Sequence, residues 1–110
     1  MSILTDCACR SAKRALRMGF RRVLLVASED GAGKARMALA GVLPQGSRCN
    51  DRGVWEVPDG ATVEVYRYSD DVPLHEGPVA FRVCHGGGDL SSEEVRDVQR
   101  WRQALPTLAA

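Results

Sequence analysis

Apolar residues near the N-terminus recur every three or four positions, the spacing that places side chains on one face of a helix. This pattern predicts a helix that is capped by Thr5 or Asp6 and runs to about Met18. Gly19 follows at the point where a glycine commonly ends a helix. Alanine and leucine side chains would form the buried stripe of this helix.

Beyond Gly19 the pattern changes to a continuous apolar run over residues 22–28, rich in Val and Leu. Such a run predicts a strand that is covered on both faces and is therefore central in its sheet. The segment SEDGAGK then interrupts the pattern. Residues 32–43, rich in Ala, Met and Leu, predict a second helix that stops before Pro44.

Two further strands are predicted over residues 54–57 and 62–68, because a Pro-Asp-Gly turn separates them and makes a hairpin. In the second of these strands, Val63 and Val65 alternate with polar neighbours such as Glu64. One face of the hairpin should therefore be buried and the other partly solvated.

The C-terminal third predicts one more strand and one more helix. Residues 79–84 alternate apolar with mixed positions, as expected for a half-buried strand. Ser91 and Glu94 form a capping-box pattern for a helix that ends before Pro106. The core face of this helix is expected to consist of Val95, Val98, Trp101 and Leu105.

Together these elements predict a single domain over residues 1–110. Its class is α/β or α+β, with the order αβαβββα and a mixed sheet of about four strands that carries three helices. A length of 110 residues with an apolar share of 45% fits one hydrophobic core. No apolar run could span a membrane and no signal peptide is evident, so we expect a cytoplasmic protein without membrane contact.

Charge is distributed unevenly along this domain. Residues 1–50 contain nine Lys/Arg and three acids, whereas residues 51–110 contain six Lys/Arg and eleven acids. Such asymmetry suggests contact with nucleic acid or another charged partner, or attraction between the two halves within the fold.

The basic residues of the N-terminal region lie three or four positions apart, so they should share one exposed helical face. We expect partner contacts from Arg10, Lys13, Arg14, Arg17 and Arg21. The leading functional hypothesis is a non-enzymatic binding module that docks through this face on an acidic protein surface or on nucleic acid. The alternative is a solvated face that the acidic half of the chain neutralises.

A second functional hypothesis concerns the segment between the first strand and the second helix. Gly31, Gly33 and Lys34 lie where backbone amides at a helix N-terminus could bind phosphate. The pattern is incomplete, because Ser28 replaces the first glycine of a P-loop and Ala35 replaces its Mg²⁺-binding Ser/Thr. It predicts at most a degenerate nucleotide- or phosphate-binding domain without efficient hydrolysis. A structural glycine turn capped by Asp30 is the simpler alternative.

The order of strand, GAGK and helix, followed by NDRGVWEVPDGATVEVYRYSDD and PVAFRVC, resembles the start of the P-loop ATPase domain of phage terminase large subunits. The resemblance covers about residues 20–90. In that family the last of these strands ends in an acidic pair that holds Mg²⁺, whereas here Cys84 and His85 follow Val83. The resemblance therefore implies a truncated, inactive relative, such as a small phage or mobile-element accessory or inhibitor protein. The alternative is that this chain and that family share only the common order of strand, turn and helix.

The remaining candidate chemistry is that of the four cysteines, Cys7, Cys9, Cys49 and Cys84. With His75 and His85 they could supply zinc ligands, but no CxxC pair occurs, and a Cys-x-Cys within a helix directs its thiols apart. We therefore expect reduced, buried structural thiols, no metal, no cofactor and no catalytic residues.

Overall fold

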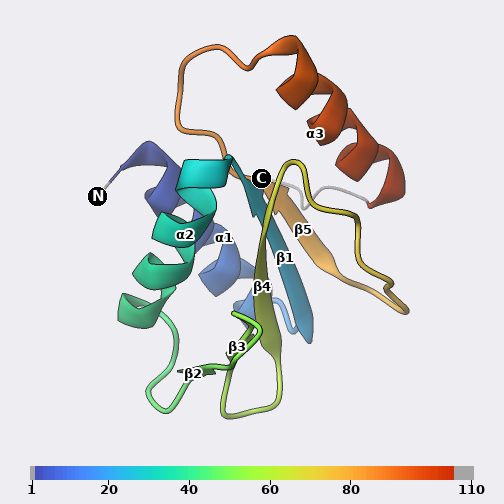
Figure 1. Cartoon of the computed structure of the whole chain (residues 1–110). Helices are drawn as coiled ribbons and strands as arrows, with labels where there is room; N and C mark the ends of the chain where they lie inside the picture. The colour runs from blue at the N-terminus through green and yellow to red at the C-terminus, as the bar shows by residue number, and fades with distance from the viewer. Residues whose placement is uncertain (1, 106–110) are drawn as a thin grey trace.

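The computed structural model describes residues 2–105 (Figure 1). Its elements are, in chain order, α1 (Ile3–Arg17), β1 (Arg22–Ala27), α2 (Glu29–Ala38), the 3-10 helix η1 (Leu39–Gly41), β2 (Arg48–Cys49), β3 (Trp55–Glu56), β4 (Thr62–Arg67), β5 (Ala80–Val83) and α3 (Ser92–Ala104). The predicted class is confirmed, since one small α+β domain carries three helices on a mixed sheet. The sheet has five strands rather than about four.

The strands lie in the order β2-β3-β4-β1-β5. β1 is parallel to both of its neighbours, β4 and β5, whereas β3 is antiparallel to both of its neighbours, β2 and β4. The predicted hairpin of β3 and β4 and the central place of β1 are thus confirmed. The additional strand, β2, was not predicted. It has only two residues, which are too few to show an alternation of apolar and polar positions.

The helices form a layer on each side of the sheet, with α1 and α2 on one side and α3 on the other (Figure 1). Alternate residues of β1 supply the two cores. Val23 and Leu25 pack with the helices of the first layer, and Leu24 and Val26 pack with α3. This two-sided burial explains why β1 is apolar at every position after Arg22.

The caps of α1 and α2 differ from the prediction. Ser2, rather than Thr5 or Asp6, caps α1, and its side chain accepts a hydrogen bond from the Thr5 amide at 3.1 Å. α2 begins at Glu29, because the Ser28 hydroxyl accepts from the amide of Gly31 at 3.1 Å. In both places the sequence offers several capping residues in succession, and the earlier serine is the one used.

The bounds of the second helix also differ from the prediction at both ends. The predicted turn SEDGAGK is mostly the first turns of α2, and Ser28 rather than Asp30 is its cap. The regular helix ends at Ala38 and continues to Gly41 as a 3-10 turn, short of the predicted end at residue 43. At the end of α1 the prediction is correct, since Gly19 adopts a left-handed φ of +92°.

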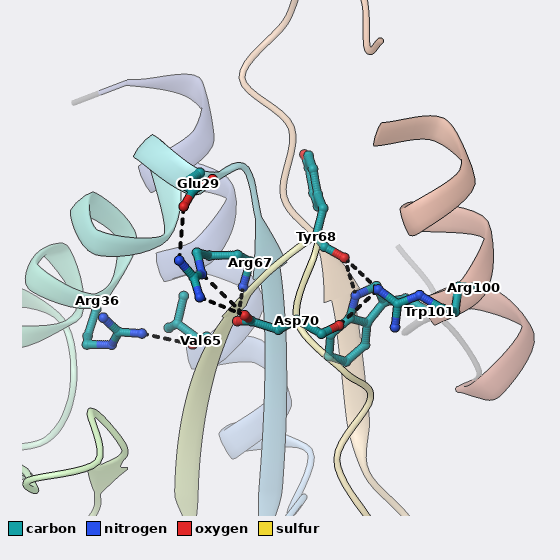
Figure 2. A network of polar contacts seen from close by, with 8 residues as sticks. All are labelled: Glu29, Arg36, Val65, Arg67, Tyr68, Asp70, Arg100 and Trp101. Carbon is teal, nitrogen blue, oxygen red and sulfur yellow. Dashed lines mark hydrogen bonds and ion pairs between the residues drawn. The ribbon is translucent and has the colours of Figure 1, made fainter. Parts of the chain in front are cut away.

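Polar contacts fasten α3 to the end of the sheet (Figure 2). The Trp101 Nε1 donates to the Tyr68 carbonyl at 3.0 Å, and Arg100 donates to the carbonyls of Tyr68 and Asp70 at 2.9 Å. Arg67, at the end of β4, contacts Asp70 and also reaches Glu29 at the start of α2 at 3.0 Å. The segment after β4 therefore connects both helical layers.

Three of the four residues predicted for the core face of α3 are buried, namely Val98, Trp101 and Leu105. Val95 is 40% exposed, contrary to the prediction. The first turn of α3 lies beyond the tips of the strands, where no sheet is present to cover it (Figure 1). The helix ends at Ala104, before Pro106, as predicted.

Candidate functional site

The basic face of α1 is formed by four of the five predicted residues, Arg10, Lys13, Arg14 and Arg17. All four are exposed, on the side of the helix opposite the buried alanines of the core. A 3.6-residue period places side chains three and four positions apart on one surface, which is why the spacing predicted the face.

Arg21 does not belong to this face, contrary to the prediction. The helix ends at Arg17, and the left-handed Gly19 redirects the chain before Arg21 is reached. Arg21 instead lies beside the turn between β3 and β4, where its guanidinium contacts Asp59 at 3.6 Å. The helical spacing continued in the sequence after the helix itself had ended.

The four cations of the face differ in their pairing. Arg10 contacts Asp6, one turn earlier, at 3.0 Å, with both side chains largely solvated. Within residues 2–105, no ion pair or side-chain hydrogen bond involves Lys13, Arg14 or Arg17. These three cations therefore carry positive charge that the described part of the domain does not pair.

Four of the eleven acids of the second half form ion pairs, and none of these pairs involves Lys13, Arg14 or Arg17 in the described residues. Glu64 pairs with Arg22, Asp70 with Arg67, and Asp97 with Arg100. Among the five basic residues predicted to contact a partner, Arg21 is the one that pairs with an acid of the second half in the described range. Its partner is Asp59. Internal neutralisation of the face by the acidic half is therefore not what the described contacts show.

An apolar groove of about 310 Å³ lies beside the basic face. Leu16, Val42, Pro44 and Val57 contribute its apolar lining. Its charged lining consists of Lys13, Arg17 and Asp59, the acid that pairs with Arg21. These residues come from α1, the end of η1 and the turn after β3, so no local pattern in the sequence could have indicated the groove. It places apolar surface directly next to unpaired cations.

The residues of the phosphate-binding hypothesis lie in the first turns of α2. Gly31 is buried and its amide is already bonded to Ser28, whereas Gly33 and Lys34 are exposed. Glu29 places a carboxylate at the same helix end and pairs with Arg67. A phosphate would have to compete with both groups, and binding by Gly31, Gly33 and Lys34 stays a prediction.

The two glycines of α2 should respond oppositely to substitution. A Cβ on Gly31 would lie 2.5 Å from Leu4 Cδ1 and 2.8 Å from Ser28 Oγ, whereas a Cβ on Gly33 would meet nothing within 4 Å. We expect Gly33→Ala to raise the free energy of unfolding by about 0.5–1 kcal/mol through helix propensity. Gly31→Ala should lower it by about 1–2 kcal/mol through overpacking. Urea unfolding of both variants tests this, and equal stabilisation by both would contradict the close approach of α1 and α2.

The structure contains a second polar site, which the sequence did not predict. Arg22 of β1 donates two hydrogen bonds to the Glu64 carboxylate, at 2.6 and 3.0 Å, and Tyr66 donates a third. Although strand alternation predicted a partly wet face here, Glu64 is only 7% exposed. The three side chains line an open concavity of about 550 Å³ on the side of the sheet that carries α3.

The charges of this trio stabilise one another. Burial alone would raise the pKa of Glu64, but hydrogen bonds from Arg22 and Tyr66 outweigh it and hold that pKa below its ordinary value. Burial and the adjacent carboxylate raise the pKa of Tyr66 to about 12. The trio is therefore a fully satisfied polar network that keeps Glu64 ionised at neutral pH.

The four cysteines are free thiols in different surroundings. Cys9 and Cys84 are buried as predicted, whereas Cys7 is half-buried. Cys49 is exposed, contrary to the prediction, because β2 lies at the edge of the sheet with both of its residues solvated.

Neither a metal cluster nor a relative specifies the site further. Within residues 2–105, no three His, Cys, Asp or Glu side chains gather where they could hold a metal ion. In the same range no helix combines the length and apolar character that a membrane span needs. Comparisons with protein-family models, with curated proteins and with solved structures find no match to this chain.

Proposed function

We propose that the protein is a non-enzymatic, cytoplasmic binding module that docks through the basic face of α1 on an acidic protein surface. The observation that carries this proposal is the absence of an ionic partner for Lys13, Arg14 and Arg17 in the described residues. A helix holds these cations in a fixed arrangement, so less conformational freedom is lost when a partner binds. Complementary charge would then guide and orient the encounter.

The groove beside the face favours a protein partner over nucleic acid. Its lining of Leu16, Val42 and Val57 offers apolar surface that phosphates cannot use. An acidic protein segment with an apolar side chain could fill the groove while its carboxylates meet Lys13 and Arg17. A phage or mobile-element accessory or inhibitor role, which the resemblance of the sequence implied, is compatible with such docking and is part of the proposal.

Reversing two charges of the face should abolish docking. We expect Arg14→Glu/Arg17→Glu to weaken partner capture by at least about tenfold, because like charges would then oppose each other across the interface. Both side chains are exposed, so the free energy of unfolding should change by less than about 0.5 kcal/mol. The measurement is capture from lysate of the source organism, with quantitative binding once the partner is identified.

The matched control is Arg96→Glu/Arg102→Glu, which reverses two exposed charges on α3 at the other side of the sheet. It changes the net charge equally and should leave capture intact. Equal capture by the α1 variant and the wild type would refute the proposal. Loss of capture after nuclease treatment, with a steep decline of affinity with salt, would assign the same face to nucleic acid instead.

A further inference from the structure

We infer that the docking surface continues past the groove beside the basic face into a second apolar groove, and that it binds an acidic protein segment through two apolar side chains. This inference rests on the proposed function and specifies the partner of the same surface. The contact of Arg21 with Asp59 marks the boundary between the two grooves.

The second groove has a volume of about 380 Å³ and lies between the end of α1 and the segment that leads into β5. Met18 and Phe20, from the turn after α1, and Pro78, from the segment before β5, contribute its apolar lining. The Met18 side chain is 56% exposed although it is large and apolar. Exposed apolar surface of this kind at the margin of a groove is typical of an interaction site.

The two grooves are neighbours. Arg17 lines the first groove, and Met18, the next residue, lines the second. Asp59 lines the first groove and Arg21 the second, and the two side chains contact each other at 3.6 Å. Both side chains are more exposed than buried, so their ion pair contributes little to stability and would not prevent a partner from lying across it. One segment can therefore reach both grooves.

Charge fixes the direction in which such a segment lies. In the part of the chain that the structure describes, no ion pair involves Lys13 or Arg17 of the first groove, or Glu76 of the second. Arg22, which also lines the second groove, already pairs with Glu64. Carboxylates of the partner would thus be attracted at the first groove and repelled at the second. The acids of the segment should flank only one of its two apolar residues.

Two grooves on one surface also explain why a protein segment would bind more tightly than an isolated apolar group. Each apolar side chain that enters a groove removes apolar area from water. Once the first side chain is bound, the second binds intramolecularly at a high effective concentration. Loss of either groove should therefore weaken binding of the whole segment.

Peptides selected from a random display library test the inference. The library is selected on the immobilised wild type, and peptides that still bind Arg14→Glu/Arg17→Glu are discarded. The remaining peptides should contain two apolar residues, with acids beside only one of them. Met18→Gln, which keeps the length of the side chain but removes its apolar character, should weaken their binding at least about fivefold. The matched control is Met37→Gln, because Met37 is an exposed methionine of α2 that lines neither groove. Its affinity should equal that of the wild type.

Titration with a selected peptide, followed by NMR, locates the binding surface. The amide signals of Gly19 and Phe20 in the second groove should shift together with those of Leu16 and Val42 in the first. Unchanged affinity of Met18→Gln, or shifts confined to the first groove, would overturn the inference and leave the docking proposal intact. A selection that yields no peptide dependent on Arg14 and Arg17 would overturn the docking proposal itself, and the inference with it.

Discussion

Replacing Trp101 by Ala should lower the free energy of unfolding by about 3–5 kcal/mol, the usual cost of removing a buried aromatic side chain. Trp101 is fully buried and stacks on Phe81, with ring centroids 6.1 Å apart, and lies 5.6 Å from the ring of Tyr66. Its Nε1 also satisfies the Tyr68 carbonyl. The substitution removes the main contact of α3 with the sheet, so α3 should detach from the sheet before the rest of the domain unfolds. Denaturant unfolding followed by circular dichroism measures the loss.

Val95→Ala provides the control on the same helix. Val95 is 40% exposed in the first turn of α3, so its truncation should cost less than that of the fully buried Trp101, by our expectation less than about 1 kcal/mol. A loss of less than about 1 kcal/mol for the Trp101 variant would mean that α3 contributes little to the stability of the domain. The second core, around Leu24 and Val26, would then have to be stable without its helical cover.

Replacing Arg22 by Met should cost about 2–4 kcal/mol at pH 7, because it leaves the buried Glu64 carboxylate without its cation. Methionine retains apolar bulk, so the loss reports mainly on charge. The Glu64 side chain is 10% exposed and that of Arg22 29%, so solvent screening is limited. Arg22 also donates to the Leu74 carbonyl at 2.7 Å, so the loop after β4 should loosen as well. Urea unfolding at pH 7 gives the magnitude.

The dependence of this loss on pH identifies its cause. The pKa of Glu64 in the folded wild type lies below its ordinary value, so the ion pair stabilises the fold above about pH 4.3, the ordinary pKa of Glu. That stabilisation disappears as the pH falls through the lower pKa of the folded state. The difference in the free energy of unfolding between wild type and Arg22→Met should therefore shrink as acidification protonates Glu64. In Arg22→Met/Glu64→Gln, which has no buried charge, part of the stability should return at pH 7. A difference that stays constant with pH would show that packing, not charge, is responsible.

Local sequence patterns were sufficient for the existence of most elements. The continuous apolar run of β1 and the capping box of Ser91 and Glu94 before α3 are local signals, and both elements form where they were expected. The starts of α1 and α2 were misplaced because neighbouring residues satisfy the same capping rule. Ser28 is selected over Asp30 because β1 ends at Ala27, which leaves one residue to join strand and helix.

The candidate site, like the helices and strands, was predictable only where a local pattern in the sequence indicates it. Helical spacing alone identified a basic face on α1, because side chains three and four apart lie together on any helix. Whether those cations were free or paired could not be inferred, since Arg21 meets Asp59 across 38 positions of sequence.

The sequence by itself determined the class of fold, the central strand and the charged face of the first helix, since each depends on a periodicity or a cap within a single segment. Tertiary structure alone decided which of the basic residues remain unpaired, that Glu64 is buried with Arg22, and that an apolar groove lies beside Lys13 and Arg17. These features arise where segments remote in sequence meet. Burial and charge pairing at such places depend on the packing of the whole domain, and no single segment carries that information.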